Sequence, residues 1–314
     1  MPTLTCVIVS YRVRDLLAAC LRSLEDNGFP GRLETIVVDN ASGDGTVETL
    51  RSRFPGVCWM RNERNIGFAP AVNQGAAAAS GRYLLLLNPD ATLIKGALER
   101  LVSFMDAHPQ VGAVGPRMLL SDGTPYVSAT RFPTVATTLL YETRLNRLCP
   151  GSRLLHPYAE QLAGNEPFPV DTVEGSCLLT RLALWRQMGG FDARYFFGVE
   201  EADYAWRLKQ AGHGVWFHPA PAAIHHHAAS TGGTRKGALI LLSVTLGYLH
   251  FLHCNKPGAA AVLRLPLLVI WIVKAALTGL LGRTEHRQAF GEGVKALLGL
   301  RPAWITPDDR RRWG

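Results

Sequence analysis

The chain has 314 residues, of which 47% are hydrophobic and 18% are charged, so it can form one large core or two modest ones. This composition excludes a disordered chain, a collagen-like fibre and a small disulfide-stapled protein. The net charge of +8 comes from the carboxyl end: residues 1–234 hold 21 basic and 21 acidic side chains, and residues 235–314 hold 12 and 4. A basic, apolar tail on a neutral body favours an anionic membrane surface over nucleic acid as a partner.

The first part of the chain alternates short apolar runs with stretches of helical spacing. The predicted elements are, in order, strand Leu4–Ser10, helix Asp15–Asp26, strand Leu33–Asp39, helix Gly45–Phe54, strand Val57–Met60, helix Ala69–Ala79, strand Tyr83–Leu87, helix Gly96–His108 and strand Ala113–Leu119. This alternation predicts an α/β fold with a mostly parallel sheet, helices on both faces, and ligands beyond the carboxyl ends of the strands.

The middle of the chain, 121–173, is rich in proline and loops, and only a weak helix near Val135–Arg147 is expected there. Ordered structure is expected to return afterwards. The predicted elements are strand Val173–Thr180, helices Leu182–Met188 and Glu200–Ala211, and strand-like runs Val215–Phe217 and Ala222–His226.

The tail is apolar and basic. Gly237–Asn255 carries no formal charge, and Leu265–Ile272 and Ala275–Gly282 are further apolar runs. Histidines interrupt the first run, and Pro266 and Lys274 interrupt the others, so none reaches the roughly 20 apolar residues that a spanning helix needs. We therefore favour helices that lie in the membrane interface, with a core helix packed on the body as the alternative for Gly237–Asn255.

Six scattered cysteines form no CxxC pair, which predicts buried thiols in a reducing compartment. Met1-Pro2-Thr3 leads directly into an apolar run without the pattern of a signal peptide. A cytosolic body is therefore expected.

Polar residues follow three of the predicted strands: Ser10-Tyr11, Asp39-Asn40 and Asn88-Pro89-Asp90. Each alone is most simply a turn or helix cap, but parallel strands would bring them to one edge of the sheet. The sequence has no GxGxxG after the first strand and no GxxxxGK[ST], which excludes a Rossmann dinucleotide site and a P-loop. An acidic strand end without such a loop suggests a metal ion between a carboxylate and a diphosphate.

Seven stretches, in this order, resemble those of the family 2 glycosyltransferases of the GT-A fold, in the rhamnosyltransferase-like branch. They are Val9-Ser10-Tyr11, Val37–Ser42, Asn65–Phe68 with Asn73-Gln74-Gly75, Leu87–Asp90, Gly189–Asp192, Phe196-Phe197 with Glu200–Asp203, and His225 ahead of Ser230-Thr231. The resemblance covers about residues 4–235. It implies a GT-A catalytic domain at 1–235, followed by a helical, membrane-associating region at 236–314.

The resemblance implies that the donor nucleotide sugar contacts polar residues at the strand ends and near the third helix, namely Ser10, Tyr11, Asp39, Asn40, Asn65, Asn73 and Asn88. Asp39 suits this role because a carboxylate accepts a hydrogen bond from a pyrimidine N3–H or a ribose hydroxyl. For Asn65 a helix cap, and for Asn73 a contact on a helix face, are equally open.

Asn88-Pro89-Asp90 stands where the family carries its Asp-x-Asp-type motif, with Asn88 replacing the first carboxylate. The resemblance implies one Mg²⁺ or Mn²⁺ held by Asp90 and His225, which would neutralise the leaving diphosphate. Neighbouring strand residues point to opposite faces, so the three consecutive histidines that begin with His225 cannot all bind one ion.

Glu201 occupies the position of the family's catalytic aspartate. We predict that it takes the proton from the acceptor hydroxyl, with Glu200 as the alternative base. Glu174, Gly175 and Asp203 are predicted on the acceptor side. A buried or capping role for Glu174, and for Asp203 an ion pair with the arginine four residues on, are the alternatives.

Together these features predict an inverting, metal-dependent glycosyltransferase. The resemblance to the rhamnosyltransferase-like branch implies dTDP-L-rhamnose as the donor, and a UDP-hexose stays open because thymine and uracil share the same N3–H edge. The acceptor would be a saccharide or a lipid-linked saccharide of cell-surface polysaccharide synthesis. The enzyme would be cytoplasmic and peripheral on the inner face of the plasma membrane.

Two other classes stay open. One is a non-catalytic membrane-bound scaffold with the same fold. The other is a nucleotide-sugar pyrophosphorylase, which needs a glycine-rich loop after the first strand; Ser10–Arg14 contains no glycine and argues against it.

Overall fold

The computed structural model describes residues 3–148, 151–226 and 234–299, so the predicted Ser230-Thr231 stretch lies outside the described residues. The chain forms two compact units. Unit 1 comprises residues 1–131, 158–193 and 201–230, and unit 2 comprises residues 132–157, 194–200 and 231–314. The functional division at residues 235 and 236 stays a prediction.

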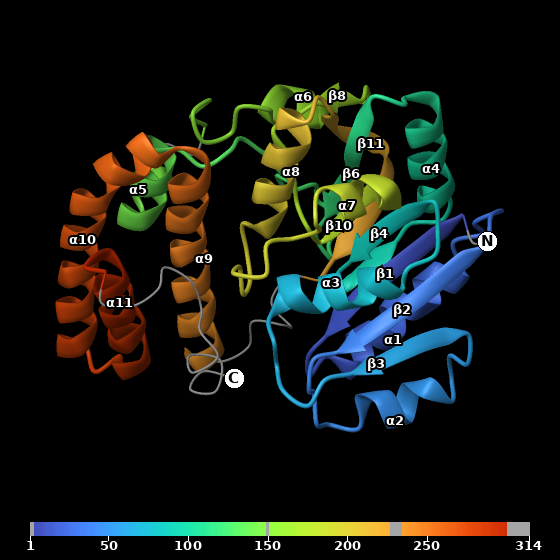
Figure 1. Cartoon of the computed structure of the whole chain (residues 1–314), viewed down its shortest axis with the longest axis horizontal. Coiled ribbons are helices and arrows are strands. Elements are labelled where there is room, and N and C mark those ends of the chain that lie inside the picture. The colour runs from blue at the N-terminus through green and yellow to red at the C-terminus, as the bar shows by residue number, and fades with distance from the viewer. Residues whose placement is uncertain (1–2, 149–150, 227–233, 300–314) are drawn as a thin grey trace. The chain divides into compact units, whose positions relative to one another are not determined.

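Unit 1 is built around a sheet with helices on both sides (Figure 1). Its strands are β1 (Leu4–Ser10), β2 (Leu33–Asp39), β3 (Val57–Arg61), β4 (Tyr83–Leu87), β5 (Ala91–Leu93), β6 (Val111–Leu119), β7 (Ala129–Thr130), β8 (Phe168–Pro169), β9 (Thr172–Val173), β10 (Cys177–Arg181) and β11 (Gly214–His225). Its helices are α1 (Arg14–Glu25), α2 (Thr46–Arg51), α3 (Phe68–Ala78), α4 (Ala97–Ala107), α6 (Ala159–Ala163), α7 (Leu182–Gln187) and α8 (Glu200–Gln210), whose first residue belongs to unit 2.

The main sheet runs in the order β3-β2-β1-β4-β10-β6-β11-β5, with β8 beside β11. Strands β3, β2, β1 and β4 are mutually parallel, and β11 is parallel to β6. Strand β10 is inserted antiparallel between β4 and β6, and β7 and β9 form a separate small sheet. The predicted α/β class with a mainly parallel central sheet is confirmed.

Alternate side chains of β1 show how the two faces are covered. Cys6 and Ile8 are buried in the same core as the apolar residues of α1 and α4. Val7 points to the opposite face, toward α3, where a Cβ added at Gly75 would lie 2.6 Å from Val7 Cγ1. Glycine at this position therefore lets α3 lie directly on the strands.

Every strand and helix predicted between residues 4 and 119 is present, with ends shifted by a few residues. Strand β5 was not predicted, because its three residues follow Asp90 within a turn-like sequence and show no alternation of their own. The cysteine prediction holds in part: Cys6, Cys20 and Cys177 are buried thiols, whereas Cys58 and Cys254 are exposed, and Cys149 lies outside the described residues.

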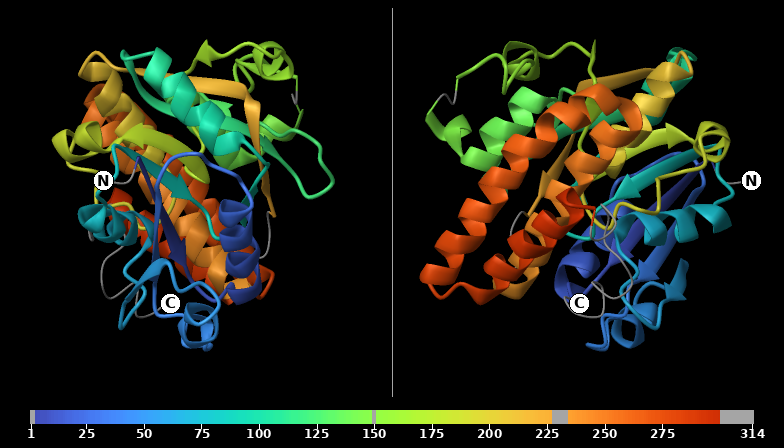
Figure 2. Two further views of the ribbon diagram at one scale, coloured as in Figure 1. Left: turned by 90° about the vertical axis from the view of Figure 1, so that its right-hand side faces the viewer. Right: turned by 60° about the vertical axis from the view of Figure 1, so that its left-hand side comes forward.

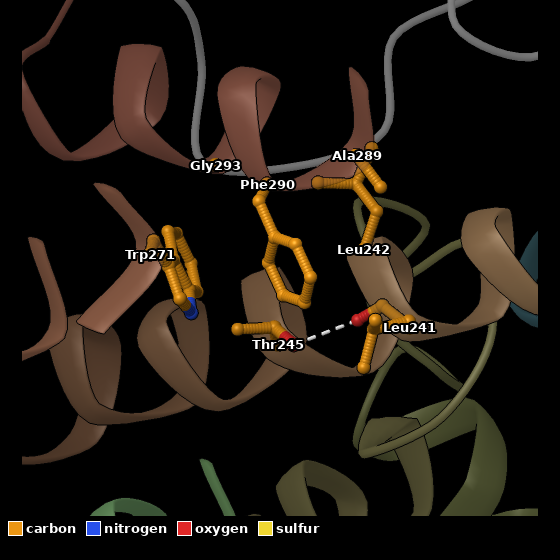
Figure 3. A pocket seen from close by; sticks show the side chains of 7 residues that line it. All are labelled: Leu241, Leu242, Thr245, Trp271, Ala289, Phe290 and Gly293. Atoms are coloured by element: carbon orange, nitrogen blue, oxygen red, sulfur yellow. Dashed lines mark hydrogen bonds between the residues drawn. The ribbon is translucent and has the colours of Figure 1, made fainter. Parts of the chain in front are cut away.

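Unit 2 contains α5 (Val135–Thr143), a short 3₁₀ turn (Leu145–Leu148), and the helices α9 (Thr234–Asn255), α10 (Pro257–Leu280) and α11 (Thr284–Leu297). The last three contact one another, and α5 packs on α10 (Figures 1 and 2). Figure 3 shows their core, where Trp271 of α10 and Phe290 of α11 face Thr245 of α9. A Cβ added at Gly293 would lie 2.4 Å from the Trp271 ring, so glycine is required for this packing.

Helix α10 corrects one expectation about the tail. Pro266 and Lys274 were expected to interrupt the apolar stretch from Leu265 to Gly282, yet a single helix, Pro257–Leu280, runs through both positions. A proline inside a helix removes one backbone hydrogen bond, and the buried Leu263, Leu267 and Trp271 hold the helix together across that point.

The two faces of α10 differ sharply in exposure. Its buried side chains recur at helical spacing, and an opposite face carries apolar side chains that are at least half exposed: Val262, Leu265, Val269, Ile272, Val273, Leu277 and Leu280. The cations of this helix belong to the packed side, since Lys274 Nζ lies 2.6 Å from Glu142 Oε2 and Arg264 Nε donates to the carbonyl of Leu297. Among the described residues, α10 alone is long and apolar enough to cross a membrane, by length and composition only.

In unit 2, helix α9 contacts residues 194–200, the segment that leads into α8. Ser243 Oγ accepts the backbone N–H of Phe197 at 3.0 Å and donates to the Phe197 carbonyl at 2.7 Å. A Cβ added at Gly247 would lie 3.1 Å from the carbonyl oxygen of Gly198. The next residue, Val199, has φ = +76°, a left-handed conformation that is strained for a β-branched side chain.

Candidate functional site

The aligned ends of β1 and β2 form one part of the site. Their parallel register pairs Ser10 with Asp39, and both side chains are buried. Asp39 Oδ2 accepts the backbone N–H of Ser42 at 3.1 Å, whereas Asp39 Oδ1 and Ser10 Oγ have no hydrogen-bond partner in the described part of the chain. Since buried polar atoms are nearly always bonded, these two are suited to bind a ligand at this edge.

Asn40 and Asn65 fasten the loop before α3 to the end of β2. Asn40 Nδ2 donates to Asn65 Oδ1 at 2.9 Å, and Asn40 Oδ1 accepts the backbone N–H of Ile66 at 3.1 Å. Asn65 Oδ1 also accepts the N–H of Gly67 at 2.9 Å, directly before α3 begins. This bond closes a turn before the helix and is not the helix cap given as the alternative for Asn65, because the N-cap of α3 is Gly67 and has no side-chain cap bond. The donor contacts of both asparagines stay predictions.

Asn73 lies on α3 and ties that helix to the turn Gly189–Asp192. Its Nδ2 donates to the carbonyl of Phe191 at 2.7 Å, and its Oδ1 accepts the N–H of the same residue at 2.9 Å. The geometry is the helix-face contact considered above. Tyr11 and Asn88 are half-buried, and their donor contacts also stay predictions.

Asp90 and His225 meet because of a strand pairing that the sequence did not predict. Strand β5 begins directly after Asp90 and pairs antiparallel with β11, with Ala91 opposite His225. His225 Nε2 lies 3.1 Å from Asp90 Oδ1, and the two residues are 5% and 2% exposed. The two predicted metal ligands are therefore brought together in one buried corner.

The other ring nitrogen of His225 faces Tyr126 and Glu174. Tyr126 Oη lies 2.9 Å from His225 Nδ1 and donates to Glu174 Oε2 at 2.6 Å, and Glu174 Oε1 lies 3.7 Å from Nδ1. Burial alone would lower the pKa of His225, but the hydrogen bond and charge of Asp90, with Glu174, outweigh it and raise that pKa. Burial and the Glu174 carboxylate raise the pKa of Tyr126, so its hydroxyl keeps its proton at neutral pH.

These donors suit a divalent cation that shares its ligands with a substrate. The described residues contain no group of three or more His, Cys, Asp or Glu side chains that could hold a metal ion by themselves. A carboxylate oxygen and an imidazole nitrogen can bind Mn²⁺ or Mg²⁺ when diphosphate oxygens and water supply the other ligands. The next residue, His226, instead contacts Ser121 Oγ through Nδ1 at 2.9 Å, as alternation along a strand predicts.

The predicted base lies at the start of α8. Glu200 is buried, and Glu201 is half-buried against Gly175, where an added Cβ would lie 3.6 Å from Glu201 Cβ. Asp203 Oδ2 accepts from Arg207 Nε at 2.8 Å, which is the ion pair given as its alternative. Glu174 and Gly175 are neighbours in sequence. Glu174 lies beside His225 and Gly175 lies beside Glu201, so this two-residue segment links the metal corner to the predicted base.

Sequence reasoning missed Tyr126. It lies in the proline-rich segment, where neither periodicity nor a motif marked it. The available signal was one aromatic residue in the short stretch Pro125–Ala129, after the predicted strand Ala113–Leu119. Aromatic residues are common in loops, so this signal was weak. Its contact with His225 depends on the small sheet of β7 and β9, which periodicity cannot predict.

Residues 5–160 match the model of the family described as glycosyl transferase family 2. The chain is 30% identical over 211 residues to an N-acetylglucosaminyl-diphospho-decaprenol L-rhamnosyltransferase of Mycobacterium tuberculosis (strain ATCC 25618 / H37Rv), covering 64% of this chain and 68% of the relative. It is 29% identical over 211 residues to the putative teichuronic acid biosynthesis glycosyltransferase TuaG of Bacillus subtilis (strain 168), covering 66% of this chain and 79% of the relative.

Solved structures share the fold. The mannosyltransferase PcManGT from Pyrobaculum calidifontis, in complex with GDP-Man and Mn²⁺, superposes with a TM-score of 0.55 at 19% identity. The match covers 96% of this chain and 88% of that one.

Proposed function

The chain belongs to glycosyl transferase family 2, and on this premise we propose that it is an inverting, metal-dependent enzyme of cell-surface polysaccharide synthesis. It would transfer a sugar from a nucleotide diphosphate donor to a saccharide or lipid-linked acceptor. The carrying observation is one sheet edge that holds the unpartnered Asp39 Oδ1 and Ser10 Oγ together with the buried Asp90–His225 pair. A non-catalytic scaffold has no need to bury polar atoms such as Asp39 Oδ1 and Ser10 Oγ without hydrogen-bond partners.

We propose dTDP-L-rhamnose as the donor and a UDP-hexose as the runner-up. Asp39 Oδ1 would accept the N3–H of the pyrimidine or a ribose hydroxyl, with Ser10 and Tyr11 beside it. The rhamnosyl donor is supported by the name of the mycobacterial relative, whose decaprenyl acceptor likewise supports a lipid-linked acceptor here. Thymine and uracil differ by one methyl group, so the base contacts alone discriminate little between them.

Asp90 and His225 would hold one Mg²⁺ or Mn²⁺ together with the donor diphosphate. When bound, the ion supplies charge neutralisation for the leaving diphosphate. Glu201 would accept the proton of the acceptor hydroxyl as that oxygen attacks the anomeric carbon from the face opposite the leaving group, which inverts the configuration. Glu200 is the alternative base, and Gly175 leaves room beside Glu201 for the acceptor.

We also propose that residues 236–314 associate the catalytic residues 1–235 with the inner face of the plasma membrane. The exposed face of α10 is apolar over its whole length, and an apolar groove between α5 and α10 opens beside it, lined by Ala136, Leu139, Leu140, Thr143, Leu145, Leu265, Pro266, Val269 and Ile270. The packed side of α10 holds Lys274 against Glu142, which leaves only the opposite, apolar face to meet lipid. A helix of this kind lies along the interface.

Calorimetric titration of dTDP, UDP and GDP, with and without Mn²⁺, tests the enzymatic proposal. We expect one pyrimidine diphosphate to bind only with Mn²⁺, and Asp90→Ala to abolish that dependence. Binding of none of the three would contradict the transferase and favour the scaffold. Preference for a nucleoside triphosphate with a sugar phosphate would favour the pyrophosphorylase.

Sedimentation with anionic phospholipid vesicles tests the membrane proposal. We expect the wild-type protein to pellet and the triple variant Val262→Ser, Leu265→Ser, Val269→Ser to stay in solution. The control exchanges two exposed apolar residues of unit 1, Ile94→Ser and Val127→Ser, which should change nothing. Equal pelleting of the triple variant and the wild type would contradict an α10 interface.

A further inference from the structure

Two strand pairings and two further backbone hydrogen bonds converge on the contact between Tyr126, Glu174 and His225. The small sheet pairs Ala129 of β7 with Val173 of β9, and the backbone N–H of Glu174 donates to the Ser128 carbonyl at 2.9 Å. The N–H of Tyr126 donates to the carbonyl of Met118 on β6, at 3.2 Å. Strand β11, which ends at His225, runs parallel to β6. These backbone bonds therefore set the positions of all three residues.

Counting hydrogens shows what each nitrogen of His225 faces. A tyrosine hydroxyl has a single hydrogen, and an ionised carboxylate can only accept. The 2.6 Å bond to Glu174 Oε2 uses that hydrogen, so Tyr126 Oη presents a lone pair to His225 Nδ1 at 2.9 Å, which requires a hydrogen on Nδ1. The Asp90 carboxylate, 3.1 Å from Nε2, likewise accepts, so without a metal Nε2 also carries a hydrogen. A metal that binds Nε2 would displace that hydrogen and leave the one on Nδ1.

We propose that Tyr126 and Glu174 are positioning residues that keep a hydrogen on His225 Nδ1 and direct Nε2 beside Asp90 as the nitrogen that would bind the metal. The inference rests on the proposed metal-dependent function and deepens it. A histidine that binds a metal through one nitrogen is commonly oriented by an acceptor on the other, and losing that acceptor costs about 10- to 100-fold in metal affinity. Here the acceptor is a tyrosine hydroxyl backed by a carboxylate.

This role for Glu174 differs in its consequences from acceptor binding. A residue that contacts the acceptor changes the KM for the acceptor and leaves metal affinity alone. A residue that orients His225 changes metal affinity and leaves the acceptor KM alone. Tyr126 adds a second distinction, because removing its hydroxyl and neutralising Glu174 interrupt the same chain of bonds and should not be additive.

The first experiment reads the tautomer without any metal. Long-range ¹H–¹⁵N spectra of histidine-labelled protein, with His225→Gln used only to assign the signal, report which nitrogen of the neutral ring is protonated. Asp90→Ala removes the competing acceptor at Nε2, so we expect the neutral ring of that variant to carry its hydrogen on Nδ1 and to lose this preference when Tyr126→Phe is added. An Nε2–H ring in Asp90→Ala would overturn the inference, whatever the enzyme binds.

The second experiment measures Mn²⁺ binding by electron paramagnetic resonance at saturating nucleoside diphosphate. We expect Tyr126→Phe and Glu174→Gln each to weaken Mn²⁺ binding about 10-fold or more, with the double variant no worse than the stronger single one. Tyr158→Phe is the matched control. The Tyr158 hydroxyl accepts the Asp171 N–H at 3.1 Å and takes no part in the contacts of His225. Unchanged Mn²⁺ affinity with a raised acceptor KM in Glu174→Gln would overturn the inference and support the acceptor role. Absent Mn²⁺ binding in the wild-type protein would instead contradict the proposed function, leaving the tautomer measurement to decide this point.

Discussion

Replacing Asp39 by asparagine tests the nucleotide side of the site with almost no change in shape. Asp39 Oδ2 is occupied by the Ser42 N–H, which leaves Oδ1 to face the ligand. In Asp39→Asn, the amide oxygen would keep the Ser42 bond and the amide NH₂ would then point at the pyrimidine N3–H, donor against donor. A hydrogen bond to a charged acceptor contributes about 1.5–3 kcal/mol, so nucleotide binding should weaken about 10- to 150-fold.

The assay is calorimetric titration of the preferred nucleoside diphosphate into both proteins at fixed Mn²⁺. The matched control is Asp44→Asn, since Asp44 also bonds a nearby backbone N–H, that of Thr46 at 3.1 Å, but lies exposed outside the sheet edge. The control should bind like the wild type. Equal affinity of Asp39→Asn and wild type, with an unchanged urea midpoint, would refute the assignment of Oδ1 to the nucleotide.

Three further predictions concern the base, a buried ion pair and pH. Glu201→Gln should bind donor nucleotide normally and lose turnover in single-turnover assays; surviving turnover, with loss in Glu200→Gln, would move the base to Glu200. Glu142→Leu should lower the free energy of unfolding by about 2–4 kcal/mol in urea titrations, because it removes the acceptor that Lys274 Nζ and the buried Trp271 Nε1–H share, and adding Lys274→Met should restore the part that comes from the unpaired charge; a single variant as stable as wild type would count against the pair. Burial, with Arg100 and His108, lowers the pKa of His218 to about 4, below its unfolded value of 6.5. Its contribution is therefore complete above pH 6.5 and is lost as the pH falls toward 4. The urea midpoint should fall on acidification from pH 7 to pH 5 by less in His218→Asn than in wild type, and identical pH profiles would speak against this.

The sequence predicted the parallel part of the sheet well, because buried strands such as Leu4–Ser10 and Tyr83–Leu87 are continuous apolar runs between helical stretches. It did not predict the direction of β10. Apolar content marks Cys177–Arg181 as a strand, but its antiparallel place between β4 and β6 depends on long-range pairing. At Pro266 the sequence predicted an interruption that the structure lacks. Helix α10 continues there because tertiary packing outweighs the local cost of one lost hydrogen bond.

The candidate site divides in the same way. Asp39 and Asp90 were recognisable as polar residues directly after buried strands, and His225 by its place in an ordered set of motifs. The contact between Asp90 and His225 arises from the pairing of β5 with β11, and β5 is too short to show a pattern. Tyr126 lacked a signal because it lies outside the strands: its backbone N–H bonds to Met118 of β6, and only the two-residue strands β7 and β9 follow nearby.

The contacts of α9 with residues 197–199 determine where the chain can be truncated. A fragment ending at Arg235 would keep every motif residue yet lose Ser243, leaving the N–H and carbonyl of Phe197 without the partner that holds them. The left-handed Val199, which costs about 1–3 kcal/mol, would then relax, and the turn into Glu200 with it. A fragment ending after Asn255 keeps α9 and omits the exposed apolar face of α10. For the design of a shortened protein, the first helix of the tail belongs with the catalytic segment.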